Sequence, residues 1–379
     1  MNIKLIAVGD IMPGGVLNGT SQEYVSQEVK NILANGDLRV GTLETAIGNE
    51  PTYYVEKMNR KADVIYAEDD DLKRLVELDI NIVSLANNHF FDLGPQGAEH
   101  TIELLDKLGI KHCGGGRNIQ EASMPAVVRI KGKTIAFLAF CDWRDETTGW
   151  CPFASDTLPG VNPMYDDYVV KEIKKYRPKF DYLVVIPHWG VEYNYMPSVN
   201  VFRTRNKMLT AGADLILGGH THCVQPIINK NGKSTVFSMG NFLFPDRLIC
   251  PPRSTYYPHP LLDITKLPIT DGYPYVKEIT FKIWKPMARI GMIVVTTLDE
   301  GGINSKASYT ILTKDNVVLL KDLSAGYRKK LNITNGMLLS GMYSQTIFLI
   351  KCIRFIRKLP MRIMRKIKTF NKIDYGIKL

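Results

Sequence analysis

The segment Leu215-Ile216-Leu217-Gly218-Gly219-His220-Thr221-His222 contains the pattern that decides the fold. A short apolar run, typical of a buried strand, ends abruptly in glycines and polar side chains. The same transition recurs along the chain, and in most cases the polar cluster is followed by a stretch of helical length. The apolar runs cover residues 3–8, 38–43, 80–86, 134–140, 182–187, 215–217 and 235–239.

Helical signals alternate with these runs. Segments with partial three- and four-residue apolar spacing cover residues 22–34, 69–78, 96–108, 165–176 and 201–211. Alternating strand and helix signals predict an α/β domain, and continuous apolar runs suit strands that are covered on both faces. We therefore expect a layered β-sandwich flanked by helices. Its polar clusters should meet at the carboxyl ends of the strands, where α/β sheets place their ligands.

The pair His220 and His222 indicates a metal site. On an extended segment, side chains two residues apart point to the same side, so both imidazoles can reach one ion. Gly218 and Gly219 allow the backbone to approach closely. An exposed histidine pair in a turn is the alternative. Other strand ends would complete a mixed nitrogen and oxygen ligand set that suits Mn, Fe or Zn: Asp10, Glu44, Asn88, His89 and His188.

The composition changes downstream of the last apolar run. Residues 245–268 are rich in Pro and Tyr, which predicts a long loop and a candidate lid over the polar clusters. Alternating apolar residues over 280–284, 290–297, 308–312 and 317–320 predict antiparallel strands that complete the same sandwich. We therefore expect one domain over residues 1–322, a connector over 323–344 and a tail over 345–379.

Net charge is concentrated at the C-terminus. The 379-residue chain has a net charge of +10, and residues 345–379 carry ten Lys and Arg against one acid, Asp374. The rest of the chain is therefore close to neutral. The six cysteines form no CxxC pair, which argues against a thiolate zinc site and favours a reducing compartment. No apolar run is long enough to span a membrane, and the first motif follows too closely for a signal peptide, so we expect a cytoplasmic protein.

The basic tail has an amphipathic pattern. On a helical wheel an apolar face opposes a basic face, although Pro360 should bend or split the helix. This pattern is typical of a helix lying on an anionic membrane surface, which would place the protein at the inner face of the membrane. Packing on its own domain is the alternative. Nucleic-acid binding is not expected, because no known module accompanies the charge. The apolar face comprises Cys352, Ile353, Ile356, Ile363 and Ile367.

The polar clusters also match a known family as an ordered series. They comprise Gly9-Asp10, Leu43-Glu44, Ala86-Asn87-Asn88-His89 with Asp92 and Gly94, His188-Trp189-Gly190 with Glu192-Tyr193, Gly212-Ala213-Asp214, Gly219-His220-Thr221-His222 with Gln225, and Gly240-Asn241-Phe242. Over about residues 3–300 the chain resembles the bacterial CapA family, which is linked to capsule and poly-γ-glutamate synthesis. That family looks like a branch of the calcineurin-like metallophosphoesterases.

The resemblance implies a role for each matched residue. The metal ligands would be Asp10, Glu44 as the bridging ligand, Asn88, His188, His220 and His222. His89 would protonate the leaving-group oxygen, held by Asp92, and Glu192, Tyr193 and Asn241 would bind substrate or support the site. The chain departs from the usual pattern at Met12, where the superfamily has a histidine, and at Glu44, where it has an aspartate. These departures leave open whether one or two ions bind.

We therefore expect a metal-dependent hydrolase of phosphoesterase type that acts in capsule, poly-γ-glutamate or related envelope-polymer synthesis. Its substrate would be a phosphorylated small molecule or the polymer, and its partners would be polymer-synthase subunits. Two alternatives use the same fold. One is an amide hydrolase or transferase acting on a glutamate polymer, and the other is a non-catalytic accessory subunit of a membrane-bound synthase.

Overall fold

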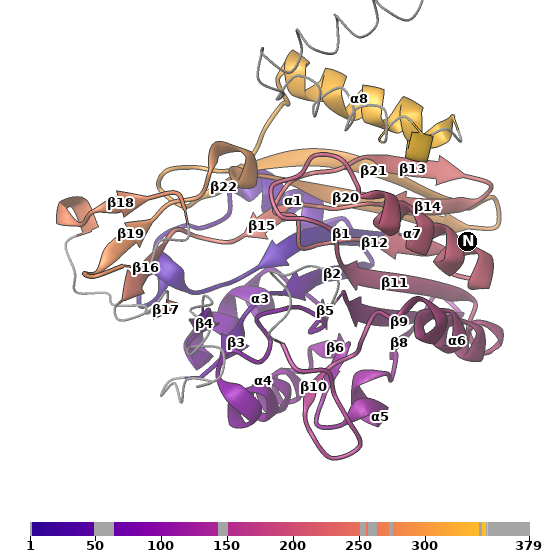
Figure 1. Cartoon of the computed structure of the whole chain (residues 1–379), viewed down its shortest axis with the longest axis horizontal. Coiled ribbons are helices and arrows are strands. Elements are labelled where there is room, and N and C mark those ends of the chain that lie inside the picture. Colours follow the sequence, from indigo (N-terminus) through magenta and orange to yellow (C-terminus); the bar gives the residue numbers. More distant parts are fainter. Residues whose placement is uncertain are drawn as a thin grey trace, which may run out of the picture. The chain divides into compact units, whose positions relative to one another are not determined.

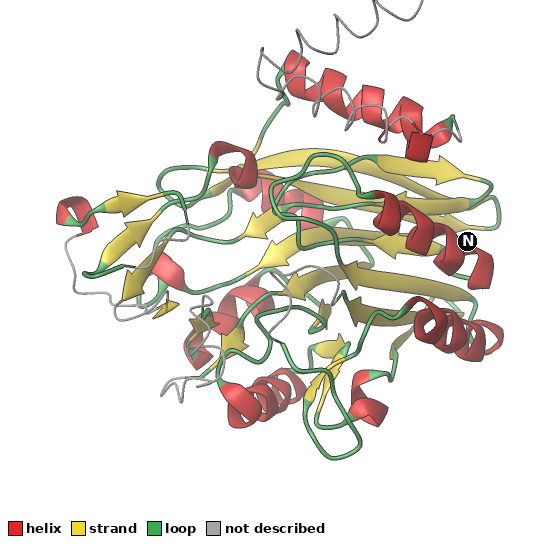
Figure 2. Cartoon of the chain, viewed as in Figure 1, coloured by secondary structure: helices red, strands yellow, loops and turns green. Residues whose placement is uncertain are grey.

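The structure is a computed structural model that describes residues 2–48, 64–142, 151–250, 255–256, 264–272, 276–340, 343–345 and 347. The chain divides into two units, Met1–Leu331 and Asn332–Leu379. The first unit contains the polar clusters and is an α/β structure of sheets and helices (Figures 1 and 2). Helix α8 (Ala325–Leu339) crosses the boundary between the units. The predicted tail lies almost entirely outside the described residues.

The larger sheet has strand order β22-β21-β20-β1-β2-β5-β6, and β15 pairs with the end of β1. The strands from β1 to β6 run parallel, whereas β20, β21 and β22 continue the sheet in antiparallel fashion. Strand β1 is central, and its last residues pair with both β2 and β15. Its strands are β1 (Ile3–Ile11), β2 (Leu38–Leu43), β5 (Ile82–Ser84), β6 (Lys111–Cys113), β15 (Asn241–Leu243), β20 (Ile290–Asp299), β21 (Gly302–Leu312) and β22 (Val318–Leu320).

The second sheet has order β13-β14-β12-β11-β9-β8. Its four inner strands are parallel, and the hairpin partners β8 and β13 close its edges in antiparallel fashion. Its strands are β8 (Ala126–Ile130), β9 (Lys133–Cys141), β11 (Tyr182–His188), β12 (Leu215–Leu217), β13 (Ile227–Lys230) and β14 (Lys233–Val236). The predicted apolar runs therefore form strands, but they are divided between two sheets.

The two sheets pack face to face around one apolar core. Strands β13 and β14 contact β21, and the hydroxyl groups of Ser234 and Ser305 lie 2.8 Å apart across this junction. Apolar side chains of both sheets, such as Val8 and Ile186, belong to the same buried cluster. The expected layered β-sandwich flanked by helices is thus confirmed.

Helices flank the sandwich at the predicted places. Helix α7 begins after Ser198, whose hydroxyl accepts from the Val201 amide (3.2 Å), and ends at Gly212 with φ +122°. It lies against the second sheet, where Arg205 donates to the Thr235 hydroxyl (3.0 Å). The helices of the first unit are α1 (Gln27–Ala34), α3 (Lys73–Glu77), α4 (Gly94–Lys107), α5 (Ile119–Ala122), α6 (Asp166–Tyr176) and α7 (Val199–Ala211), with 3₁₀ turns at Gly15–Leu17, Asp69–Leu72, Arg177–Lys179, Ile264–Lys266 and Pro286–Arg289.

The segment predicted as a long loop is partly a sheet, so that prediction is wrong for the residues described. Strands β16 (Arg247–Cys250) and β17 (Thr255–Tyr256) join β18 (Ile269–Thr270) and β19 (Thr280–Lys282) in a small sheet of order β17-β16-β19-β18. Residues 251–254 and 257–263 lie outside the described part, and the lid role stays a prediction. Two two-stranded ladders complete the structure: β3 (Ala46–Ile47) with β4 (Tyr66–Ala67), and β7 (Gly115–Gly116) with β10 (Gly160–Val161).

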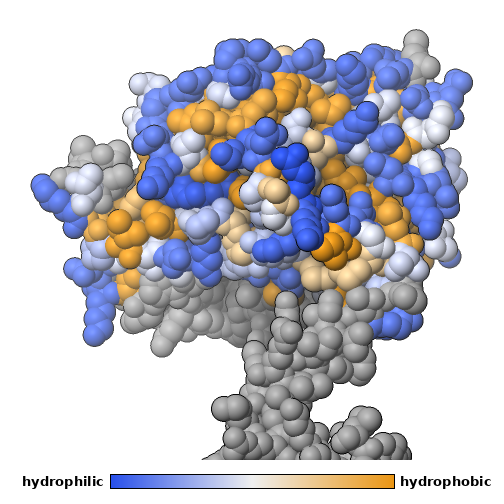
Figure 3. Space-filling model, turned by 90° about the horizontal axis from the view of Figure 1, so that it is seen from above, coloured by the Kyte–Doolittle hydropathy of each residue, from blue (hydrophilic) through white to orange (hydrophobic). Residues whose placement is uncertain are grey.

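The surface of the described residues is mixed in character. Figure 3 shows hydrophobic patches interspersed with hydrophilic side chains on one face. Among the described helices, none is both long enough and apolar enough to cross a membrane.

Candidate metal centre

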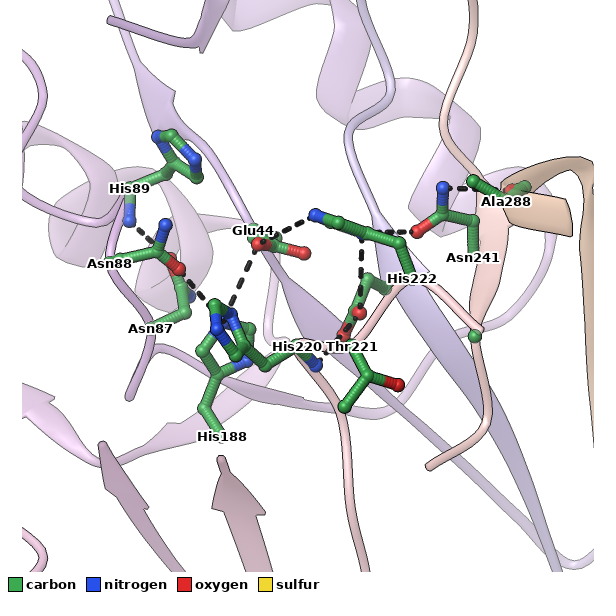
Figure 4. A network of polar contacts seen from close by, with 12 residues as sticks. Glu44, Asn87, Asn88, His89, His188, His220, Thr221, His222, Asn241 and Ala288 are labelled. Carbon is green, nitrogen blue, oxygen red and sulfur yellow. Dashed lines mark hydrogen bonds and ion pairs between the residues drawn. The ribbon is translucent and has the colours of Figure 1, made fainter. Parts of the chain in front are cut away.

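The predicted ligands converge at the carboxyl ends of strands from both sheets. Asp10 lies on β1, Glu44 directly follows β2, and His188 is the last residue of β11. His220 and His222 follow β12. All five side chains are buried, with exposed fractions of 3% or less. Figure 4 shows Glu44 between the histidines, with His188 and His220 on one side and His222 on the other.

Two groups of potential ligands share Glu44. Glu44, His188 and His220 form one group, and Asp10, Glu44 and His222 form the other. Within each group the candidate ligand atoms lie within 4.8 Å of one another. If each group held an ion, Glu44 would supply a carboxylate to both.

Orphaned buried atoms show that these residues fit a cation. Asp10 Oδ1, both carboxylate oxygens of Glu44 and His188 Nδ1 are buried and have no hydrogen-bond partner among the described residues. Buried polar atoms in native structures nearly always have a partner, so such a cluster of exceptions requires an explanation. Divalent cations bind carboxylate oxygens and imidazole nitrogens of this kind.

The shifted pKa values of the buried acids and histidines also fit a bound cation. Burial raises the pKa of Asp10 to about 7, and burial together with the charge of Asp10 raises the pKa of Glu44 well above its usual value. Burial and the neighbouring His220 lower the pKa values of His188 and His222. A bound cation would offset the cost of burying charged carboxylates, because it favours their ionised form. It would also favour neutral imidazoles, which are the form that binds metal.

The backbone around the histidine pair differs from the prediction. His220 and His222 have φ values of +85° and +50°, so they lie in left-handed turns, and the predicted extended segment is wrong. The nearby glycine does serve a close approach, because a Cβ on Gly219 would lie 2.6 Å from Asp10 Oδ1. The His220 amide donates to Asp10 Oδ2 (3.1 Å). This turn connects the second sheet to Asp10 on β1.

Asn88, His89 and Asp92 lie beside the ligand cluster. Asn88 Oδ1 is 2.8 Å from His188 Nε2. His89 Nδ1 is 2.6 Å from Asp92 Oδ2, as the sequence predicts, and the Ile65 amide donates to the same carboxylate oxygen (2.6 Å). Asp92 is fully buried and His89 nearly so. The carboxylate therefore fixes the orientation of the His89 ring and leaves Nε2 for other contacts.

Of the predicted substrate residues, Tyr193 and Asn241 lie against His222. The Tyr193 ring is 5.9 Å from the His222 ring, and the negative charge of Glu192 contributes to the raised pKa of Glu44. Asn241 Oδ1 is 2.7 Å from His222 Nδ1, and the Asn241 amide group donates to the Ala288 carbonyl (3.0 Å). In this structure Asn241 orients the His222 ring, and a contact between Asn241 and substrate stays a prediction.

Comparison with known proteins places the chain in a family. Residues 4–246 match the family described as "Bacterial capsule synthesis protein PGA_cap". The chain belongs to this family. It is 31% identical over 255 residues to the capsule biosynthesis protein CapA of Bacillus anthracis, covering 64% of the chain and 60% of that protein. It is 29% identical to the PGA biosynthesis protein CapA of Bacillus subtilis (62% of each).

Two further comparisons are more distant. A protein of Mycobacterium tuberculosis named "Probable polyglutamine synthesis accessory protein" is 26% identical over 54% of the chain and 55% of its own length. A crystal structure of 5′-nucleotidase from Candida albicans aligns with 89% of this chain and 58% of its own, at 11% identity and a TM-score of 0.39. The chain spans about 60% of the length of the two Bacillus relatives.

Two residues of this PGA_cap protein were not predicted as part of the site. Asn87 connects the ligand loops, because its side chain donates to the Leu43 carbonyl (2.8 Å) and accepts from the His89 amide (2.9 Å). Its place between a strand and Asn88 was the available signal. Arg247 is buried, and its charge acts on both Glu44 and His222. It lies in the segment expected to be a loop, so the sequence carried no sign of it.

Proposed function

We propose that this chain is a metal-dependent hydrolase of phosphoesterase type that acts in the synthesis of a capsule, poly-γ-glutamate or related envelope polymer. The observation that carries the proposal is the pair of three-residue groups sharing Glu44. The ions expected there are Mn, Fe or Zn, because the donors are imidazoles and carboxylates without a thiolate. Bound cations would polarise a phosphoryl group and activate water.

Residues of the chain itself would donate a proton, position a histidine and contact the substrate. Asp92 holds the His89 ring through Nδ1, so a protonated His89 could donate from Nε2 to the departing oxygen. General acid catalysis of this kind contributes about 10²–10⁴-fold. Asn88 would hold His188 in place through their 2.8 Å contact, and Glu192 and Tyr193 would line the approach to His222.

The biological setting is inferred from the names of the relatives. The Bacillus relatives are named for capsule and PGA biosynthesis, so the substrate would be a phosphorylated precursor or the envelope polymer. We place the protein in the cytoplasm, with the basic segment 345–379 binding the anionic inner face of the membrane beside polymer-synthase subunits.

Metal content and hydrolysis together test the proposal. Elemental analysis of wild type should find one or two equivalents of Mn, Fe or Zn, and His220→Ala should lose metal. The loaded wild type should hydrolyse an aryl phosphate, and a chelator should abolish this activity. His89→Ala should retain metal but lose about 10²-fold or more in kcat. A wild type that takes up no metal would refute the proposal, and hydrolysis only of a γ-linked glutamate oligomer would favour amide chemistry instead.

One observation favours the accessory-subunit alternative. Met12 is fully buried at the position where the resemblance implies a histidine ligand, and a soft thioether is a poor ligand for Mn. A relative is also named as an accessory protein. If the protein binds metal but hydrolyses neither phosphoesters nor γ-glutamyl oligomers, while increasing polymer output when added to synthase membranes, this alternative holds.

A further inference from the structure

The turn that contains His220 and His222 has a strained backbone. Their φ values of +85° and +50° lie in the left-handed region, which residues with a Cβ atom rarely adopt. Such conformations persist only where surrounding contacts hold them, and they are concentrated at functional sites. His220 belongs to one candidate ligand group and His222 to the other. The conformation of this turn therefore sets which ion position each imidazole would face.

Thr221, between the two histidines, makes contacts that hold the turn. The residue is buried. Its Oγ1 donates to the Cys223 carbonyl (2.9 Å), accepts from the Cys223 amide (3.4 Å) and lies 2.9 Å from Ser238 Oγ. A hydroxyl group can donate one hydrogen bond and accept two, so all three contacts can form together when Ser238 is a donor. The Thr221 hydroxyl thus closes the turn and attaches it to Ser238.

Ser238 connects the turn to other parts of the candidate centre. Its Oγ accepts from the Gly240 amide (3.3 Å). The Gly240 carbonyl in turn accepts from the Asp10 amide (3.0 Å). The next residue, Asn241, has its Oδ1 2.7 Å from His222 Nδ1. The contact between the two hydroxyl groups therefore joins two segments that both position candidate ligands.

We propose that the hydroxyl pair of Thr221 and Ser238 is a positioning element that keeps His220 and His222 directed at separate ion positions. Thr221 would act on metal binding through the two imidazoles, because loss of its hydrogen bonds would let the strained turn relax. In invoking a bound ion the inference rests on the proposed function, but metal binding requires no turnover.

Zinc affinity of the full chain tests the role of the hydroxyl. Thr221→Val removes the hydroxyl but keeps the methyl group beside Gly190, where an added Cβ would lie 3.1 Å from it. In competition with a chromophoric chelator, Thr221→Val should bind zinc at least about tenfold more weakly, as is typical when a partner that orients a metal-binding histidine is lost. Ser238→Ala should weaken zinc binding in the same direction. Thr221→Ser is the matched control, because it keeps the hydroxyl, and its affinity should stay close to that of wild type.

A spectroscopic measurement separates positioning from a general loss of stability. The absorption bands of cobalt(II)-loaded protein depend on the type and geometry of the ligands. Thr221→Val should therefore change these bands, and Thr221→Ser should give the wild-type spectrum. Urea unfolding of the metal-free proteins shows whether each variant is folded. If Thr221→Val does not fold, Ser238→Ala takes its place, because it removes the second hydroxyl of the pair and leaves the turn sequence intact.

Two results would overturn the inference while leaving the proposed function in place. The first is a wild-type zinc affinity and cobalt spectrum in the folded hydroxyl-deletion variants. The second is equal weakening in Thr221→Ser and Thr221→Val, because the hydroxyl would then not be the cause. A wild type that binds zinc but hydrolyses no phosphoester, with the expected loss of affinity in Thr221→Val, would refute the proposed function and support the inference. A wild type that takes up no metal would overturn both.

Discussion

Asn241 should control metal affinity without being a ligand. Its Oδ1 is 2.7 Å from His222 Nδ1, and its amide nitrogen is held by the Ala288 carbonyl. This network assigns the proton to Nδ1 and leaves His222 Nε2 facing Glu44 Oε1, 3.9 Å away. Partners that orient a metal-binding histidine are typically worth 10–100-fold in metal affinity. Asn241→Leu should therefore weaken binding by about 1.4–2.8 kcal/mol.

Competition with a chromophoric chelator measures this effect. The zinc affinities of wild type, Asn241→Leu and Asn241→Asp are compared at the same pH and ionic strength. Asn241→Asp keeps an acceptor for the Nδ1 proton, so its affinity should equal or exceed that of wild type. Unchanged affinity in Asn241→Leu, or equal weakening in both variants, would refute the idea that Asn241 acts by orienting His222.

Other predictions concern stoichiometry, stability and acid response. Glu44→Ala should empty both metal positions, whereas His222→Ala should keep one ion, because only Glu44 belongs to both groups. Elemental analysis measures the number of ions in each variant, and equal losses of metal would contradict the shared role of Glu44. Arg74→Ala should lower the free energy of unfolding in urea by about 3–5 kcal/mol, because buried Arg74 pairs with Asp71 and donates to the Pro13 carbonyl (3.0 Å); a loss below ~1 kcal/mol would argue against it. Hydrogen bonds to the Asp181 carboxylate, led by the one from the Thr134 amide, lower its pKa from 3.8 to about 2. The contribution of ionised Asp181 to the stability of the fold is therefore complete above about pH 4 and disappears as the pH falls through 2. Asp181→Asn should cost less than about 1 kcal/mol at pH 7, and the difference from wild type should shrink in acid unfolding curves; a difference that grows in acid would be inconsistent with this.

The local sequence pattern predicted the positions of individual strands better than the way in which the strands assemble into sheets. The apolar runs at 38–43 and 215–217 coincide with β2 (Leu38–Leu43) and β12 (Leu215–Leu217). The division of the strands into two sheets was not predictable, because it depends on pairings such as β1 with β20, which lie far apart in the sequence. Local periodicity contains no information about such partners.

The same difference between local and long-range information applies to the candidate site. The residue types at the strand ends indicated which side chains would meet: Asp10, Glu44, His188, His220 and His222 are all buried and lie in the two groups that could hold an ion, whereas their role as ligands stays a prediction. The left-handed turns at His220 and His222 were not predictable, because non-glycine residues rarely adopt positive φ. Arg247 was missed because its burial depends on the packing of Trp284 and Phe244, which only the folded chain brings together.

Because the candidate ligands come from the strand ends of both sheets, an ion bound here would act as a cross-link within the fold. Asp10 and Glu44 lie on or directly after strands of the larger sheet, whereas His188, His220 and His222 lie at or after the ends of strands in the second one. An unfolded chain cannot present this set, so occupancy would stabilise the native state by RT ln(1 + [L]/Kd), or about 2.7 kcal/mol at a free-ion concentration of 100 Kd. Separation of the two sheets would then be coupled to release of the ion. The lifetime of the protein in a cell would consequently follow the supply of that metal, independently of any reaction it catalyses.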